Sequence, residues 1–441
     1  KTRIAIVLFL MLAANARAAD SPGNAVSPAI RATEDAALAL YVDAVRGDDG
    51  DGGLSPEAAL RTLSAAQAAM DKVPEDKKVV LLLARGSVWR EAYEHKGPGR
   101  APRYPAFTFG RPRLTIRAYG EGDKPTISGY DPLPNNKFAP HDPERYPNVW
   151  SQRVTPPSTY YIRFWEKIGA HPGVLVGGDR GLVYIWAPLM ENEQMRDQPL
   201  KQTGIESEED ALSFVNAHAG SFYVRHNRDR TADYFINSGS DPTTDGLSYE
   251  YKVRGAFFIS SGNTWENIRY KGLTHRDGVS GRPHRLKGVE FLYGTTHNML
   301  ISEGHFEDVV SVGLRPVIEG VSLHWFGSTA TAFHTHGAAE RGIIYDRCMA
   351  RNVGIAFFDH RAGTNRPAAV LRDCVTEEVR TIMGHGECTL KSFIVGHRHQ
   401  GRDGTATGQL GGLTAGENYI EDSMFRLAFR GGWHAGCKHL R

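Results

Sequence analysis

The sequence contains few cysteines and no apolar run long enough to cross a membrane. Its four cysteines, among 441 residues, all lie in the last quarter: Cys348, Cys374, Cys388 and Cys437. None stands at the Cys-x-x-Cys spacing of a zinc site, so we interpret them as structural or free. The apolar run at residues 4–14 is shorter than the roughly 20 residues that a spanning helix needs. We therefore predict no metal centre built on cysteine and no membrane span.

The chain also lacks an excess of charge of either sign. Lys and Arg number 52 and Asp and Glu number 50, which gives a formal net charge of +2. A protein so close to neutrality has no global field that gathers nucleic acid or anionic membrane. We expect no nucleic-acid partner, and any affinity for a charged ligand must be local.

The first 18 residues have the order of a secretory signal peptide. Lys1 and Arg3 precede the short apolar run, and the small-residue pattern Ala16-Arg17-Ala18 follows it. A buried first helix is the alternative interpretation. Cleavage after Ala18 would remove three positive charges and change the net charge from +2 to −1 (2 − 3). The sequence therefore predicts a secreted or periplasmic protein.

The first folded segment begins with a short apolar strand at residues 40–42, followed by an acidic glycine-rich turn. Ser55 and Pro56 are typical of a helix cap and first position, and Leu60, Leu63 and Met70 follow at helical spacing. The aspartates of the turn do not match the ligand spacing of an EF-hand loop, so a plain turn is favoured over a calcium site.

Three stretches resemble right-handed parallel β-helix proteins of the pectate-lyase-like superfamily: "YVDAVRGDDGDGGLSPEAALRTLSAAQ", "LLLARGSVWRE" and "IRAYGEGDKPTISG". The resemblance implies an all-β fold, a right-handed parallel β-helix with an N-terminal capping helix. A helix laid over the open end of a strand stack blocks edge pairing. We expect the cap and first coils in residues 19–130, an irregular β insertion or side sheet in 131–250, and the main coils in 251–441.

Repeats in the second half support this fold. The segments "ATAFHTHG", "IAFFDHRAG" and "RTIMGHGE" align Phe333 with Phe358 and Met383, at steps of 25 residues (358 − 333 and 383 − 358). Such a step accommodates three short strands and three turns per coil. The alignment predicts that His334 stacks on Asp359, and that Thr335 stacks on His360 and His385.

Vertical stacking would turn these positions into neighbours about 4.8 Å apart. Histidine is the side chain most easily tuned for proton transfer near neutral pH. Stacked interior polar residues can equally satisfy one another as structure. A metal held by His334 and His336 with a residue of the next coil is a weaker alternative. The predicted catalytic residues are Asp359, His360, Arg361, His385 and Lys391, and the predicted substrate-binding residues are His305, His334, His336 and Arg398.

The resemblance implies action on an acidic polysaccharide. Removing the proton beside a uronate carboxylate requires that the carboxylate be neutralised and that a base and an acid be in place. Arg361 or Arg398 would bind the carboxylate, His360, His385 or Lys391 would act as base, and Asp359 would orient a histidine or hold Ca²⁺. We therefore predict a monomeric polysaccharide lyase or epimerase.

Two other functions stay open at this point. A glycoside hydrolase needs two carboxyl groups about 5 to 9.5 Å apart. The candidates on adjoining coils are Asp346, Asp359, Asp373 and Glu387. The third possibility is a protein without catalysis that binds glycan or serves as a scaffold, because fold alone does not fix function.

Overall fold

The computed structural model describes residues 38–91, 106–155, 173–185 and 205–400 with breaks, the longest of them 315–330, and the strands 409–410, 418–421, 424–425 and 437–440. Residues 1–18 lie outside this part, so the signal peptide stays a prediction. The described residues are mostly β, as predicted, with only two α-helices, α1 (Leu63–Met70) and α3 (Glu208–Ala217). No helix in the described part is long and apolar enough to cross a bilayer.

Three parallel sheets form the main body, and the first, sheet A, has eleven strands. Its strands, in spatial order, are β1 (Leu38–Val42), β2 (Val79–Ala84), β5 (Leu114–Tyr119), β17 (Thr264–Glu266), β20 (His284–Lys287), β23 (Gly304–Glu307), β26 (Ile343–Asp346), β29 (Ala369–Arg372), β32 (Ser392–Val395), β35 (Asn418–Glu421) and β37 (Cys437–Leu440).

Sheets B and C have nine and eight strands. Sheet B contains β3 (Val88–Trp89), β6 (Thr126–Ser128), β18 (Arg269–Lys271), β21 (Glu290–Gly294), β24 (Val310–Gly313), β27 (Met349–Arg351), β30 (Val375–Glu377), β33 (Arg398–Gln400) and β36 (Met424–Phe425). Sheet C contains β4 (Ala106–Phe109), β16 (Ala256–Ile259), β19 (Thr274–Asp277), β22 (His297–Ile301), β25 (Thr331–Gly337), β28 (Ile355–Arg361), β31 (Thr381–His385) and β34 (Gln409–Leu410).

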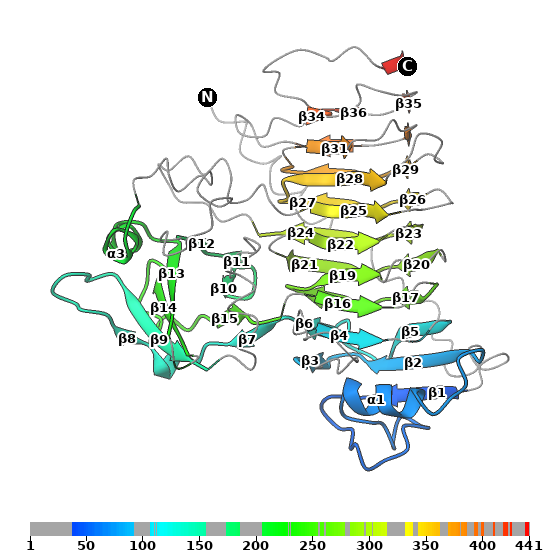
Figure 1. Cartoon of the computed structure of the whole chain (residues 1–441), viewed down its shortest axis with the longest axis horizontal. Helices are drawn as coiled ribbons and strands as arrows, with labels where there is room; N and C mark the ends of the chain where they lie inside the picture. The colour runs from blue at the N-terminus through cyan, green and yellow to red at the C-terminus, as the bar shows by residue number, and fades with distance from the viewer. Residues whose placement is uncertain are drawn as a thin grey trace, which may run out of the picture.

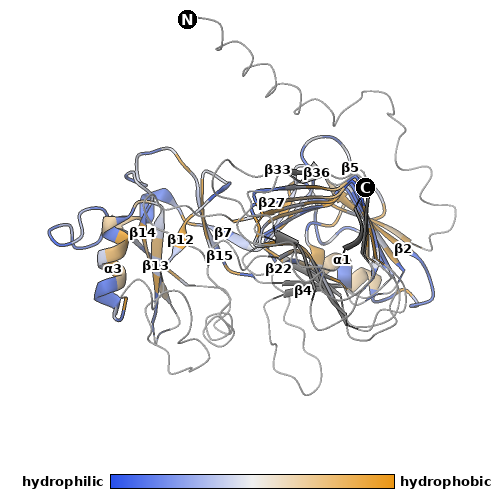
Figure 2. Ribbon diagram, turned by 90° about the horizontal axis from the view of Figure 1, so that it is seen from above, coloured by the Kyte–Doolittle hydropathy of each residue, from blue (hydrophilic) through white to orange (hydrophobic). Residues whose placement is uncertain are grey.

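The chain visits the three sheets in turn. From β17 onward, successive strands belong to sheets A, B and C, and each strand pairs in parallel with the strand one coil earlier. Figure 1 shows the resulting stack of strands, and Figure 2, which looks along it, shows the three sides. Residues about two dozen positions apart thus become neighbours across a strand pair.

The corners between sheets are made by single residues in the left-handed conformation. Between sheets A and B this residue is Asn267, Gly288, Asp308, Arg347 or Asp373 in successive coils, with φ between 50° and 61°. Tyr293, Asn352 and Glu378 do the same between sheets B and C. A residue with positive φ reverses the local bend, so two strands can meet at an angle with only two residues between them.

Beside each A–B corner residue, the next side chain enters the interior. The stack in successive coils is Ile268, Val289, Val309, Cys348 and Cys374, all fully buried. The two cysteines therefore stand where other coils have valine or isoleucine. Both are free thiols, as the sequence interpretation allowed, and their Sγ atoms donate to the carbonyl oxygens of Phe306 and Tyr345.

Helix α1 lies at the N-terminal end of the stack, beside β1 and β2 (Figure 1). It begins later than the Ser55–Pro56 start expected from the sequence. Leu60 pairs with strand β1 instead, since its N–H donates to Tyr41 and its carbonyl accepts from Asp43. Thr62 is the N-cap.

A separate side unit is built from residues 130–252. It contains two sheets, and its elements are β7 (Tyr130–Pro132), β8 (Ala139–Pro140), β9 (Trp150–Val154), β10 (Val174–Val176), β11 (Arg180–Gly181), β12 (Val183–Tyr184), β13 (Ser221–His226), β14 (Ala232–Asn237), β15 (Tyr249–Lys252), the short 3-10 helix η1 (Asn135–Lys137) and α3. All pairs in these sheets are antiparallel except β12 with β13.

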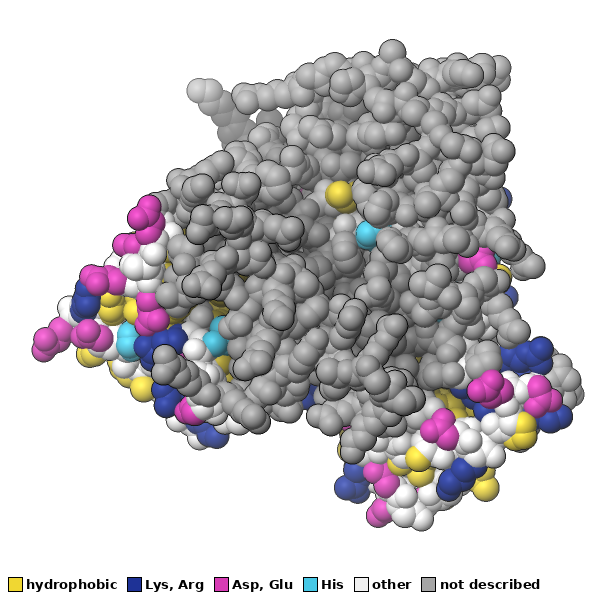
Figure 3. Space-filling model, in the orientation of Figure 1, with side chains coloured by type: hydrophobic (Ala, Val, Ile, Leu, Met, Phe, Trp, Pro, Cys, Tyr) yellow, Lys and Arg dark blue, Asp and Glu magenta, His cyan; other side chains and the backbone are white. Residues whose placement is uncertain are grey.

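The side unit contacts the coil through a small apolar junction. Tyr130 and Leu175 of the unit cluster with Leu314, which follows β24. The Tyr130 hydroxyl donates to the carbonyl of Tyr293, 3.0 Å away, and Lys271 of sheet B forms an ion pair with Glu250. Figure 3 shows that the charged side chains of the described residues gather on the side unit and around the N-terminal end of the stack.

Candidate functional site

Strands β25, β28 and β31 of sheet C carry most of the predicted site residues. Their observed register differs by one residue from the sequence alignment. Phe333 pairs with Phe357, not Phe358, and Phe357 pairs with Met383, so the steps are 24 and 26 residues (357 − 333 and 383 − 357). The expected stacking of His334 on Asp359 and of Thr335 on His360 is therefore wrong.

The corrected register still brings titratable residues together. His336 pairs with His360, and Asp359 pairs with Thr335 on one side and His385 on the other. His334 pairs instead with Phe358. One column of Cα atoms thus contains two histidines, and the neighbouring column contains the aspartate and the third histidine.

Apolar packing inside the coil fixes these strands. The rings of Phe333 and Phe357 stack with their centroids 5.0 Å apart, and Tyr345 of sheet A contacts both. Because side chains alternate between the two sides of a strand, the buried phenylalanines define the register of the polar residues that follow them. His334 and Thr335 are themselves buried.

The remaining predicted residues are distributed over other sheets. His305 lies on β23 of sheet A, and Arg398 lies on β33 of sheet B. The expectation that one face carries all of them is not met. Lys391 lies outside the described residues. The side chains of His336, Asp359, His360, Arg361, His385 and Arg398 also lie outside them, so their catalytic and binding roles stay predictions.

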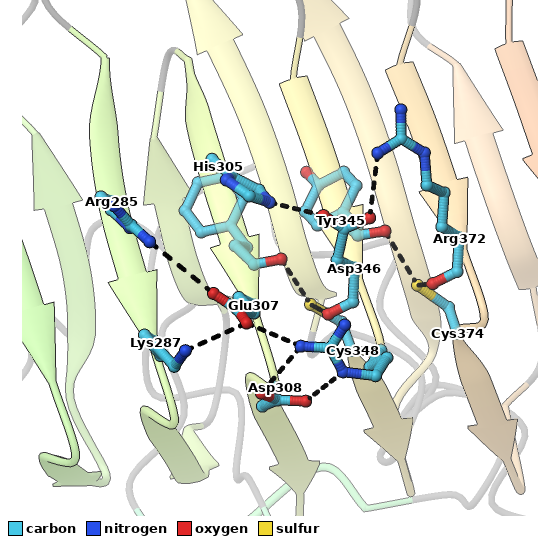
Figure 4. Close-up of polar contacts among 12 residues, drawn as sticks. Arg285, Lys287, His305, Glu307, Asp308, Tyr345, Asp346, Cys348, Arg372 and Cys374 are labelled. Carbon is cyan, nitrogen blue, oxygen red and sulfur yellow. Dashed lines mark hydrogen bonds and ion pairs between the residues drawn. The ribbon is translucent and has the colours of Figure 1, made fainter.

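His305 belongs to a polar network on sheet A, which Figure 4 shows. Its Nε2 lies 2.5 Å from Oδ2 of Asp346 on the next coil. The other oxygen of that carboxylate, Oδ1, lies 3.6 Å from a guanidinium nitrogen of Arg372, one coil further on. Asp346 is thus held between a histidine and an arginine.

Glu307 is the second acidic centre of this network. Lys287 donates to it at 3.1 Å and Arg347 at 2.7 Å, and these hydrogen bonds lower the pKa of the Glu307 carboxyl. Arg347 also makes a two-pronged contact with Asp308, which raises the pKa of its guanidinium. Lys287, Arg347 and Arg372 were missed in the sequence, although their place one coil from His305, Glu307 or Asp346 follows from the repeat.

The carboxylates considered for hydrolysis do not share one surface. Asp346 lies on sheet A, Asp373 at an A–B corner and Asp359 on sheet C, while Glu387 lies outside the described residues. In the described part, no group of three or more His, Cys, Asp or Glu side chains is arranged to hold a metal ion. The Ca²⁺ role of Asp359 is not tested, because its side chain lies outside that part.

The acidic turn near the N-terminus is occupied by hydrogen bonds. Asp49 accepts from the backbone N–H groups of Arg61 and Thr62 and from the Thr62 hydroxyl. Asp48 accepts from the N–H of Gly50. These contacts agree with the turn favoured in the sequence.

Two basic groups of the side unit have strongly lowered pKa values. Burial lowers the pKa of Lys252 to about 7 and that of His226 to about 4. Neither was singled out in the sequence, because their burial comes from the packing of the side sheets. They are the described groups that titrate furthest below their ordinary range.

Comparison with known proteins shows only distant likeness. No protein-family model matches the chain, and no curated protein matches it. The structure of XylC with xylose is 11% identical, with a TM-score of 0.45 over 87% of this chain and 69% of that one. The native GH136 lacto-N-biosidase from Eubacterium ramulus is 12% identical, with a TM-score of 0.28 over 88% of this chain. This chain spans 55% of that enzyme's length.

Proposed function

We propose that the three-sheet coil is a right-handed parallel β-helix and that α1 is its N-terminal cap. The order of sheets A, B and C along the chain supports this fold. Leu63, Ala66 and Met70 of α1 are fully buried in the same apolar cluster as the coil interior, which supports the capping role. The proposed localisation, secreted or periplasmic, rests on residues 1–18 alone.

We further propose that the protein is a carbohydrate-active enzyme, a lyase or epimerase of an acidic polysaccharide. The observation that carries this proposal is the register of sheet C. It aligns His336 with His360 and Asp359 with His385 on adjacent strands, which lie about 4.8 Å apart. Three coils thereby contribute titratable residues to one patch of backbone.

The residue types in this patch match the steps of uronate chemistry. The carboxylate of the sugar must be neutralised, and Arg361, at the end of β28, is the proposed partner. His360 or His385 takes the proton from the neighbouring carbon, and Lys391 acts as the second base or acid. Loss of the leaving oxygen gives elimination, whereas return of the proton to the opposite face gives epimerisation.

The test is an absorbance assay on uronate polymers. Purified protein is incubated with polygalacturonate or alginate, and the ultraviolet absorbance of an unsaturated uronate is followed. Wild-type protein should produce it, and His360→Ala and His385→Ala should each lower the rate at least a hundredfold, as expected for a lost general base. His218→Gln is the matched control, because this histidine caps the end of α3 in the side unit.

Other outcomes would replace the proposal. New reducing ends without ultraviolet absorbance would indicate hydrolysis by paired carboxylates. Glycan binding without any product would indicate a module that lacks catalysis. Activity retained in both histidine variants would exclude sheet C as the catalytic site.

A further inference from the structure

The outer face of sheet A presents basic side chains above acidic ones. Arg285, Lys287 and Arg372 are 58%, 47% and 55% exposed, whereas the carboxylates of Glu307 and Asp346 are only 19% and 15% exposed. The carboxylates therefore lie close to the sheet, and the cationic ends of the longer side chains face the solvent. The outermost layer of charge is positive, although acidic groups are present beneath it.

The register of the sheet produces this layer. Lys287, Glu307, Asp346 and Arg372 follow one another in a single column, each on the next coil. In the column beside it, Arg285 pairs with His305. Neighbouring coils are about 4.8 Å apart, so the cations are fixed at defined heights along the stack.

The layer continues around the corner between sheets A and B. Arg347 is half exposed while it contacts Glu307 and Asp308. Arg351 on β27 is likewise half exposed above Glu377. A guanidinium has five N–H donors, so an arginine that contacts one carboxylate keeps donors for a second one.

We infer that this basic layer, formed by Arg285, Lys287, Arg347, Arg351 and Arg372, binds a linear polyanionic glycan. The surface is separate from the proposed catalytic strands of sheet C and goes beyond the proposed function. A chain of uronate sugars that lies along the stack meets a cation on successive coils, and arginine binds carboxylates in a planar, two-pronged geometry.

The modest charge of the layer favours a glycan over a nucleic acid. Arg285, Lys287, Arg347 and Arg372 stand against Glu307, Asp308 and Asp346, which gives a net charge of +1 (4 − 3). Duplex DNA carries one negative charge per roughly 1.7 Å and is bound by surfaces that neutralise many phosphates. A uronate polymer carries one carboxylate per sugar and matches a sparser array.

The test is affinity electrophoresis in gels that contain polygalacturonate, with the triple variant Arg285→Gln, Lys287→Gln and Arg372→Gln. The fold should be kept, because Glu307 retains Arg347 and Asp346 retains His305. Circular dichroism melting checks this. The expected result is at least tenfold weaker binding and a flatter dependence on salt. The double variant Arg46→Gln and Arg145→Gln, which removes exposed arginines elsewhere, should bind as the wild type does.

Binding of polygalacturonate unchanged in the folded triple variant would overturn the inference. Equal retention in gels that contain neutral dextran, or tighter binding of duplex DNA, would also overturn it. The assay is repeated in a His360→Ala background, so that the two proposals fail separately. Loss of binding in the triple variant without any lyase product in the wild type would leave this inference standing and reject the proposed function.

Discussion

Gly272 illustrates how a single residue can hold two parts of the molecule together. It stands at a B–C corner with φ of 69°, and an added Cβ would lie inside the contact radius of the Tyr130 ring. Tyr130 is the first residue of the side unit and is fully buried at its junction with the coil. Glycine is therefore required here for two reasons, its conformation and its size.

Replacing Gly272 by alanine should destabilise the protein strongly. The left-handed conformation costs an alanine about 1 to 2 kcal/mol, and overpacking against Tyr130 adds about 1 to 3 kcal/mol. Gly86→Ala is the matched control, since φ is 81° there but nothing lies within 4 Å of the new Cβ. Urea unfolding should show a markedly lower midpoint for Gly272→Ala than for Gly86→Ala, and equal midpoints would contradict the close contact.

His226 shows how the side unit can set a pH dependence. Its Nδ1 is buried without a hydrogen-bond partner among the described residues, and burial lowers its pKa to about 4. The ordinary value, about 6.5, applies to the unfolded chain. Between these two values the unfolded state binds more protons than the folded state, so stability falls as the pH falls.

We predict that His226→Leu removes this part of the acid sensitivity. From pH 6.5 to pH 4 the wild type should lose about 3 kcal/mol more than the variant in free energy of unfolding, because each pKa unit corresponds to about 1.4 kcal/mol. Urea unfolding at both pH values measures the difference. Parallel losses in the two proteins would show that His226 titrates normally in the folded state.

At the scale of the strand and its corners, the left-handed residues set the geometry of each coil. Asp373 adopts φ of 50° at an A–B corner, with an exposed side chain. This conformation is unstrained only for glycine, while a β-branched residue meets the highest cost there.

We therefore expect Asp373→Gly to stabilise the coil by about 1 kcal/mol and Asp373→Val to destabilise it by at least as much. Thermal melting followed by circular dichroism orders the three proteins. If the glycine variant melted below the wild type, the left-handed corner would be refuted. The same variants bear on hydrolysis, because Asp373 is one of the carboxylates considered for it.

Elements also show where sequence reasoning worked and where it failed. Alternating apolar residues and the repeat step were sufficient to predict parallel coils, since burial selects one side of each strand. The register was wrong by one residue because the coils are 24 and 26 residues long rather than 25 each. Loop lengths vary between coils, so a constant step cannot locate Phe357. Helix α1 began late because Leu60 pairs with β1, a contact between distant residues.

For the molecule as a whole, the all-β class was predictable and the distribution of polar residues was not. The sequence shows that His305, His334 and Arg398 recur in coils, but it does not show which of three sheets each one reaches. The structure divides them among sheets A, C and B. That division separates a candidate catalytic patch on sheet C from the basic layer on sheet A. The two surfaces could then act on the same polymer without sharing residues.

The most direct test of the account is a cysteine cross-link across β25 and β28. The native cysteines are first removed as Cys348→Val, Cys374→Val, Cys388→Ser and Cys437→Ser. Valine suits the first two positions, because Val289 and Val309 occupy them in other coils. Partners in neighbouring parallel strands have Cα atoms about 4.8 Å apart, within the range that a disulfide spans.

Two pairs are then compared by mass spectrometry after mild oxidation. His336→Cys with His360→Cys should form an intramolecular disulfide, because these residues are partners in the observed register. Thr335→Cys with His360→Cys should not, since residues one step out of register lie on opposite sides of a pleated strand. A disulfide in the second pair and none in the first would contradict the register, and with it the proposed catalytic patch.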